Sequence, residues 1–110
     1  MSEIIGRNRD IISLKVVMKF SAEATRLFSI IGDDGQWPEV LSPRILKRKP
    51  HTKVIAALSD FSRPEFSIES TADGCEVTLL HDLIKSDEAR KEYRKIWNAW
   101  FKTLAKRVSL

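Results

Sequence analysis

The sequence lacks several features that define common protein classes. Cys75 is the only cysteine among 110 residues, which excludes an internal disulfide and a cysteine-cluster metal site. With four glycines, the chain has neither a Gly-rich phosphate-binding loop nor a Gly-x-Ser-x-Gly elbow. No apolar run approaches the length of a membrane span, and the first six residues lack the apolar core of a signal peptide. We therefore expect a cytoplasmic protein without a membrane span or a cofactor.

The composition that remains is typical of one soluble globular domain. Hydrophobic residues make up 43% of the chain and charged residues 31%, so we expect a single domain over residues 1–110, with 1–9 as a flexible lead-in. The net charge of +4 is uneven, because residues 1–43 carry −1 and residues 44–110 carry +5. Such an asymmetry permits an acidic partner without requiring one.

The most informative stretch is the last one, Ser86–Arg107, which the sequence predicts to be a long helix. Steps of three and four separate its apolar residues, as one buried helical stripe requires. Ser86 is a suitable N-cap, and Asp87 and Glu88 lie where the helix dipole favours acids. The apolar stripe consists of Ala89, Tyr93, Ile96, Trp97, Trp100, Phe101, Leu104, Ala105 and Val108.

The segments before it predict strands and two short helices. Alternation over Ile11–Phe20 indicates a half-buried strand, Ser21 can cap a helix that Gly32 ends, and Gln36–Leu41 predicts a second short helix. Short turns between the later strands require antiparallel pairing. The expected fold is therefore α+β, in the order β-α-α-β-β-β-β-α, with about five strands wrapped on the last helix. The four later strands are Arg44–Lys49, Lys53–Ser59, Glu65–Thr71 and Cys75–Leu83.

Four stretches of the chain resemble the START-like (SRPBCC) helix-grip superfamily, and within it the homologues of the activator of the heat-shock-protein-90 ATPase. They are the strand and helix start at Leu14–Glu23, the pair Gln36-Trp37, the strand Gly74–His81, and the closing helix from Asp87 to Leu104. The resemblance implies a helix-grip fold with an apolar cavity between sheet and last helix. Family members usually have two further strands before the one expected at Arg44, so a cavity here would be smaller or open. Cys75 stands where the family often has Thr.

Ten residues are candidates for the lining of such a cavity. They lie on the inner faces of the expected strands, in the second short helix and on the stripe of the last helix. The alternative is that these side chains simply fill the core, because aromatic side chains bury large areas. The candidate lining is Met18, Trp37, Phe66, Ile68, Val77, Leu79, His81, Tyr93, Trp97 and Trp100.

Catalytic and metal chemistry have little support in the sequence. His81 ends an apolar strand face and could orient a ligand or act as an acid or base, but a hydrogen-bonded core histidine is the plainer interpretation. His51 lies in an expected turn, and the two histidines have no metal-ligand spacing, so we expect no metal. Cys75 has no basic neighbour that would activate its thiol. We therefore predict no catalytic residues.

A basic segment suggests a different role. Five cations lie close together at Arg44, Lys47, Arg48, Lys49 and Lys53. Nucleic acid is a poor match, since the aromatic side chains of the last helix face the core and cannot stack on bases.

The first functional hypothesis is a non-catalytic domain that binds a small hydrophobic molecule, and the second is an interaction module for an acidic protein partner. A polyketide-cyclase-like enzyme is third, and a homodimer that covers the open sheet edge is a further expectation.

Overall fold

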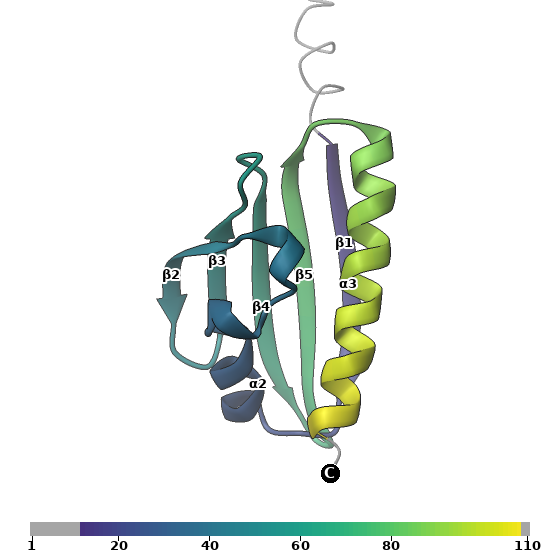
Figure 1. Cartoon of the computed structure of the whole chain (residues 1–110). Coiled ribbons are helices and arrows are strands. Elements are labelled where there is room, and N and C mark those ends of the chain that lie inside the picture. Colours follow the sequence, from purple (N-terminus) through teal and green to yellow (C-terminus); the bar gives the residue numbers. More distant parts are fainter. Residues whose placement is uncertain (1–11, 109–110) are drawn as a thin grey trace, which may run out of the picture.

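The computed structural model describes residues 12–108, which form one antiparallel sheet with a long helix along its inner face (Figure 1). The expected lead-in, residues 1–9, and Ile11 lie outside the described residues. The helices are α2 (Ala24–Ile31) and α3 (Asp87–Val108), with 3₁₀ turns η1 (Asp34–Gln36) and η2 (Glu39–Leu41) between α2 and β2. The strands are β1 (Ile12–Phe20), β2 (Arg44–Lys49), β3 (Lys53–Ala57), β4 (Arg63–Thr71) and β5 (Gly74–Ile84). The α+β fold and the predicted element order are confirmed.

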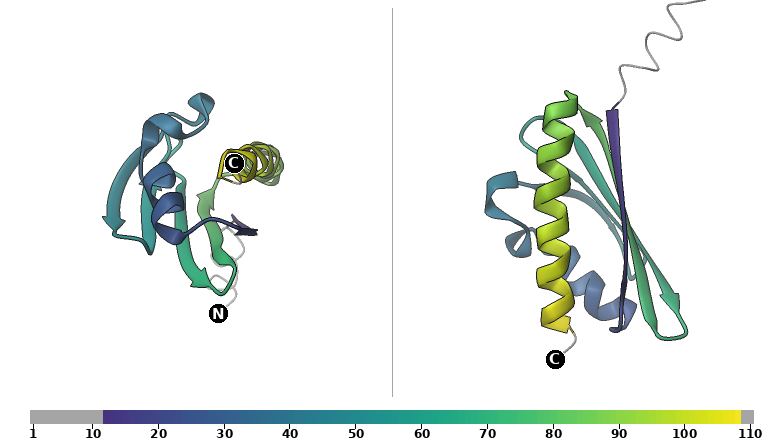
Figure 2. Two further views of the ribbon diagram at one scale, coloured as in Figure 1. Left: turned by 90° about the horizontal axis from the view of Figure 1, so that it is seen from below. Right: turned by 90° about the vertical axis from the view of Figure 1, so that its right-hand side faces the viewer.

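The five strands follow the order β1-β5-β4-β3-β2, so the strands from β2 to β5 form a meander and β1 closes on β5. Figure 2 shows that the sheet is strongly twisted and that α3 runs along its β1–β5 side. At the other side α2 packs mainly on β4, and η1 and η2 cross in front of the sheet (Figure 1). This arrangement leaves β1 and β2 as the two edge strands.

Helix α3 contributes its apolar stripe to the core, as the sequence predicts. The backbone N–H of Ala89 donates a hydrogen bond to Ser86 Oγ at 3.0 Å, which confirms the predicted N-cap. Trp97, Phe101 and Leu104 are completely buried. The exposed residues Arg94 and Lys95 lie on the opposite face of the helix.

Three local predictions need correction. The N-cap of α2 is Glu23, whose carbonyl accepts from the N–H groups of Arg26 and Leu27, and not Ser21. The expected helix Gln36–Leu41 is replaced by η1 and η2, because Pro38 stands between them and lacks an N–H. The strand expected to reach Ser59 ends at Ala57, where the N–H of Leu58 donates to the carbonyl of Ser62 and closes the β3–β4 loop.

The hairpin between β4 and β5 depends on Gly74. Its φ of 154° is a conformation that other residues rarely adopt, and an added Cβ would lie 2.1 Å from the carbonyl oxygen of Phe20. Gly74→Ala is therefore expected to lower the free energy of unfolding by about 1–3 kcal/mol, as measured by chemical denaturation. Gly35→Ala is the control, because an added Cβ there meets only the Asp33 side chain at 3.2 Å. Equal stability of the two variants would contradict the close contact at Gly74.

Candidate functional site

The inner face of the sheet carries one packed group of aromatic rings. The ring centroid of Phe66 lies 5.2 Å from that of Trp37 and 5.4 Å from that of Trp97, and Trp97 lies 5.5 Å from Trp100. Phe101 adds a further ring, 6.1 Å from Phe66. Edge-to-face contacts of this kind are favourable and exclude water. The aromatic cluster therefore joins β4 and α3 to the segment between η1 and η2.

Each of the three indole N–H groups has a hydrogen-bond acceptor. Trp37 donates to the carbonyl of Ile31 at 2.7 Å, and Trp100 donates to the carbonyl of Gln36 at 3.0 Å. These two bonds tie the segment around η1 to α2 and α3. The third indole, Trp97, donates to Nδ1 of His81 at 3.0 Å and so begins a buried polar network.

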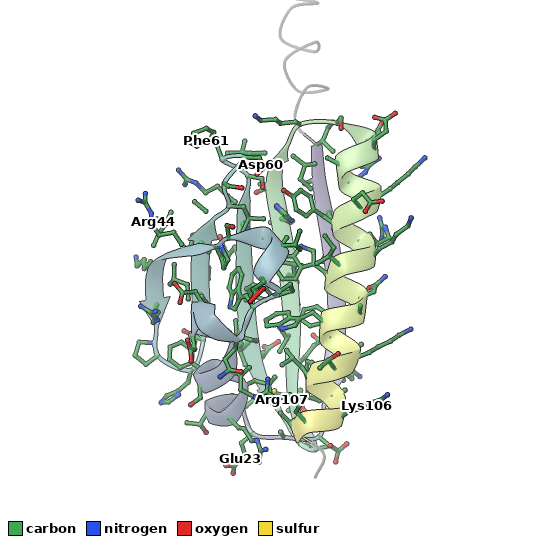
Figure 3. All side chains as sticks on the ribbon, viewed as in Figure 1. Glu23, Arg44, Asp60, Phe61, Lys106 and Arg107 are labelled. Atoms are coloured by element: carbon green, nitrogen blue, oxygen red, sulfur yellow. The ribbon has the colours of Figure 1, made fainter. Side chains whose placement is uncertain are left out.

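The polar network runs from α3 across β5 to the β3–β4 loop. His81 Nε2 lies 2.8 Å from Ser62 Oγ, which donates to Asp60 Oδ1 at 2.6 Å. The Tyr93 hydroxyl donates to the other carboxylate oxygen, Asp60 Oδ2, at 2.5 Å. The ring of Tyr93 also packs on that of His81, with centroids 4.4 Å apart. In Figure 3, Asp60 lies at the same end of the molecule as the start of α3.

The tautomer of His81 follows from its partners. An indole N–H only donates, so Nδ1 of His81 is the acceptor and carries no proton. The neutral ring then has its proton on Nε2 and donates it to Ser62 Oγ. The Ser62 hydroxyl in turn donates a hydrogen bond to Asp60, so the three hydrogen bonds from Trp97 to Asp60 all run in the same direction.

Burial and the network set the titration of the three ionisable groups. Burial lowers the pKa of His81 from 6.5 to about 4, against the opposing effect of the Asp60 carboxylate. Burial and the hydrogen bond to Asp60 raise the pKa of Tyr93 to about 12. Burial alone would raise the pKa of Asp60, but the hydrogen bonds from Ser62 and Tyr93 outweigh it and lower that pKa.

Ser, His and Asp side chains meet here in the wrong order for nucleophilic catalysis. A catalytic histidine accepts the serine proton on a free ring nitrogen, while the carboxylate holds the other nitrogen. In this network Ser62 lies between His81 and Asp60, and the unprotonated nitrogen of His81 accepts from Trp97. Ser62 is also completely buried. In this arrangement the hydrogen bonds connect the β3–β4 loop to α3, and no base is placed to activate Ser62.

An apolar groove opens beside this network. It has a volume of about 330 Å³ and lies between η2, the β3–β4 loop and the first half of α3. Val40, one of its walls, is 74% exposed. The groove is lined by Val40, Leu41, Ser59, Ala89, Glu92, Tyr93 and Ile96.

The predicted lining residues lie together on the inner side of the fold. Phe66, Val77, Leu79, His81 and Trp97 are completely buried, as the alternation and helical stripe predicted. Trp37, Ile68 and Trp100 are buried, whereas Met18 and Tyr93 are only half-buried. Tyr93 is the one predicted residue that also lines the groove.

The residues that sequence reasoning missed belong to loops. Asp60 and Ser62 lie in a stretch that the sequence marks only as a connection, and Val40 is one apolar residue in a 3₁₀ turn. The fragment Asp60-Phe61-Ser62 carries a weak signal, because Asp side chains bond nearby backbone N–H groups in turns, as Asp60 does with the N–H of Ser62 at 2.9 Å.

The remaining predicted candidates lie apart from the groove. Cys75 is buried, and burial raises the pKa of its thiol. His51 lies in the exposed β2–β3 turn with its ring 5.6 Å from that of Phe28. The basic residues Arg44, Lys47, Arg48 and Lys49 lie on the edge strand β2, and Lys53 begins β3. Within residues 12–108, no group of three His, Cys, Asp or Glu side chains could hold a metal ion, and no helix is long and apolar enough to cross a membrane.

Comparison with known proteins finds likeness in structure alone. No protein-family model and no curated protein matches the sequence. The fold is similar to an AHSA1-like protein from Rhizobium etli, with a TM-score of 0.70 and 10% identity over 86% of this chain and 80% of the other. It is similar to the Aha1 dimer of Colwellia psychrerythraea, with a TM-score of 0.71 and 12% identity over 88% and 96%.

A further similar structure is the di-domain ARO/CYC protein StfQ of the steffimycin biosynthetic pathway. The TM-score is 0.67 at 12% identity, and the match covers 96% of this chain and 53% of that protein. The three comparisons cover 86%, 88% and 96% of this chain. The chain therefore has the START-like (SRPBCC) helix-grip fold.

Proposed function

We propose that the chain is a non-catalytic binding domain that holds a small apolar molecule in the groove between η2, the β3–β4 loop and α3. The observation that carries this proposal is the groove itself, a hollow of about 330 Å³ with Val40, Leu41, Ala89 and Ile96 as apolar walls. Its volume suits a small molecule, and a mostly apolar hollow with few polar groups is the usual form of a ligand site.

The polar groups at the groove favour a neutral ligand. The Tyr93 hydroxyl already donates its proton to Asp60, so it offers a ligand only an acceptor. The carboxylate of Glu92 at the rim forms an ion pair with Lys95 at 3.6 Å and offers an anion no hydrogen-bond donor. A flat or acyl-like neutral molecule with one hydrogen-bond donor fits this lining best, whereas a phosphate or sugar would lack partners.

The sequence analysis expected a cavity among ten residues on the inner side of the fold. This proposal instead places the ligand in the groove beside those residues. The aromatic rings of Trp37, Phe66 and Trp97 contact one another, and the groove lies beside them. The similar structures include an ARO/CYC protein, which leaves a cyclase-like activity as the alternative. The protonation pattern of His81 supports binding over acid–base chemistry.

Titration with neutral aromatic and acyl compounds tests the proposal. Compounds that bind are expected to shift the backbone NMR signals of Val40, Ala89 and Ile96, and to compete with one another. Ala89→Trp, which fills the groove, is expected to weaken binding roughly tenfold or more. Ala99→Trp is the matched control, because Ala99 lies on the exposed face of the same helix. Equal loss in both variants, or shifts confined to other surfaces, would refute the groove as the site.

A further inference from the structure

Strand β2 is an edge strand with an unusual charge. Its backbone pairs with β3 on one side, and no strand of residues 12–108 pairs with it on the other. Four of its six residues are Lys or Arg, and none is acidic. A free strand edge can accept another extended chain through main-chain hydrogen bonds.

A β-bulge gathers three of these cations on one face. Arg44 pairs with Ala57, Lys47 with Ile55 and Lys49 with Lys53, with the register shift between Ile45 and Lys47. Because Val54 and Ala56 of β3 are buried on the inner face, Ile55 and Ala57 belong to the outer face. Without the extra residue of the bulge, Arg44 and Lys47 would lie on opposite faces. The bulge therefore aligns Arg44, Lys47 and Lys49 along the outer side of the edge.

These three cations are free to bind, whereas their neighbours are engaged. Arg48 belongs to the inner face and donates to the carbonyl of Gly32 at 2.7 Å, and Lys53 pairs with Glu65 at 2.9 Å. Within the described chain, the side chains of Arg44, Lys47 and Lys49 form no ion pair or hydrogen bond, and the Thr52 hydroxyl donates only to the backbone carbonyl of Lys49. In Figure 3, Arg44 points away from the sheet at its free edge.

A hollow with both polar and apolar walls lies at the start of the same strand. It has a volume of about 280 Å³ and is lined by Ser42, Arg44, Ala57, Leu58, Ser59 and Phe61. Phe61 is 78% exposed and has a φ of 71°, a left-handed conformation that is strained for a bulky residue. Strained and exposed aromatic residues are common at binding surfaces.

We infer that β2 is the docking site for an extended acidic segment of another protein, which adds to the sheet as a further strand. Its carboxylates would face Arg44, Lys47 and Lys49, and an apolar residue at one end would enter the hollow beside Phe61. A second copy of β2 would set like charges against each other, which is unfavourable between paired strands. Nucleic acid would leave the main-chain groups of the edge unused. The apolar groove contains none of the three cations and shares only Ser59 with the hollow beside Phe61.

A short synthetic peptide of alternating glutamate and valine, ending in leucine, is the probe. On binding, the amides of β2 are expected to be protected from hydrogen exchange, and the signals of Phe61 to shift. The triple variant R44E/K47E/K49E is expected to weaken binding roughly tenfold or more, with a steep salt dependence in the wild type. The matched control K91E/K95E/K102E makes the same charge change on exposed residues of α3. It is expected to bind as the wild type does.

Three results would overturn the inference. The first is no binding of the peptide, or an equal loss in both triple variants, which would indicate a general charge effect. The second is protection of β2 that depends on protein concentration alone, which would indicate a homodimer. The third is tighter binding of a short single-stranded DNA through the same residues, with displacement of the peptide. The Ala89→Trp variant, altered only in the groove, is expected to bind the peptide normally.

Discussion

Trp97→Ala is expected to lower the free energy of unfolding by about 3–5 kcal/mol, through lost burial and the cavity that remains. Trp97 is completely buried, and its ring contacts those of Trp37, Phe66, Trp100 and His81. The substitution also removes the hydrogen bond from the Trp97 indole N–H to His81, and so leaves the buried Nδ1 of His81 without a donor. Chemical denaturation monitored by circular dichroism measures the change.

Two variants separate these contributions. Lys95→Ala, on the exposed face of α3, is expected to lower stability by no more than about 0.5 kcal/mol. Trp97→Phe keeps an aromatic ring but removes the donor, so its effect should lie between those of the other two. Similar denaturation midpoints for Trp97→Ala and Lys95→Ala would show that the buried face of α3 is wrongly assigned.

The second large effect concerns pH. Because the folded state lowers the pKa of His81 from 6.5 to about 4, the unfolded chain binds more protons than the folded one between these values. The part of the free energy of unfolding that depends on neutral His81 is therefore fully present above a pH of about 6.5 and is lost as the pH falls toward about 4. At about 1.4 kcal/mol for each pKa unit, the total loss is about 3 kcal/mol.

The structural reason is that protonated His81 would carry a proton on Nδ1, which would face the donating N–H of Trp97. Asp60 has a lowered pKa, so its protonation at still lower pH removes further stability. Urea denaturation at a series of pH values measures the slope. His81→Leu is expected to abolish the dependence on pH in this range, and the control His51→Asn, in the exposed turn, to keep it. A slope that survives in His81→Leu would assign the effect to other groups.

The local patterns of the sequence predict the fold well because each one reports burial along a single element. The alternation in β5 places Val77, Leu79 and His81 on one face, and the steps of three and four in α3 place Trp97 and Trp100 on another, so the two faces must meet. Short turns between the strands then leave only antiparallel pairing. These signals need no knowledge of distant contacts.

The candidate sites depend on contacts that no local pattern encodes. The direction of the protons from Trp97 to Asp60 is determined when α3, β5 and the β3–β4 loop come together, because only then does each donor meet its acceptor. The bulge that aligns Arg44 with Lys47 is likewise a property of the β2–β3 pairing. The sequence by itself determined the fold class, the buried faces and the basic edge strand. The tertiary structure alone decided which side chains share a site, since the partners are far apart in the chain and meet only when the sheet closes on α3.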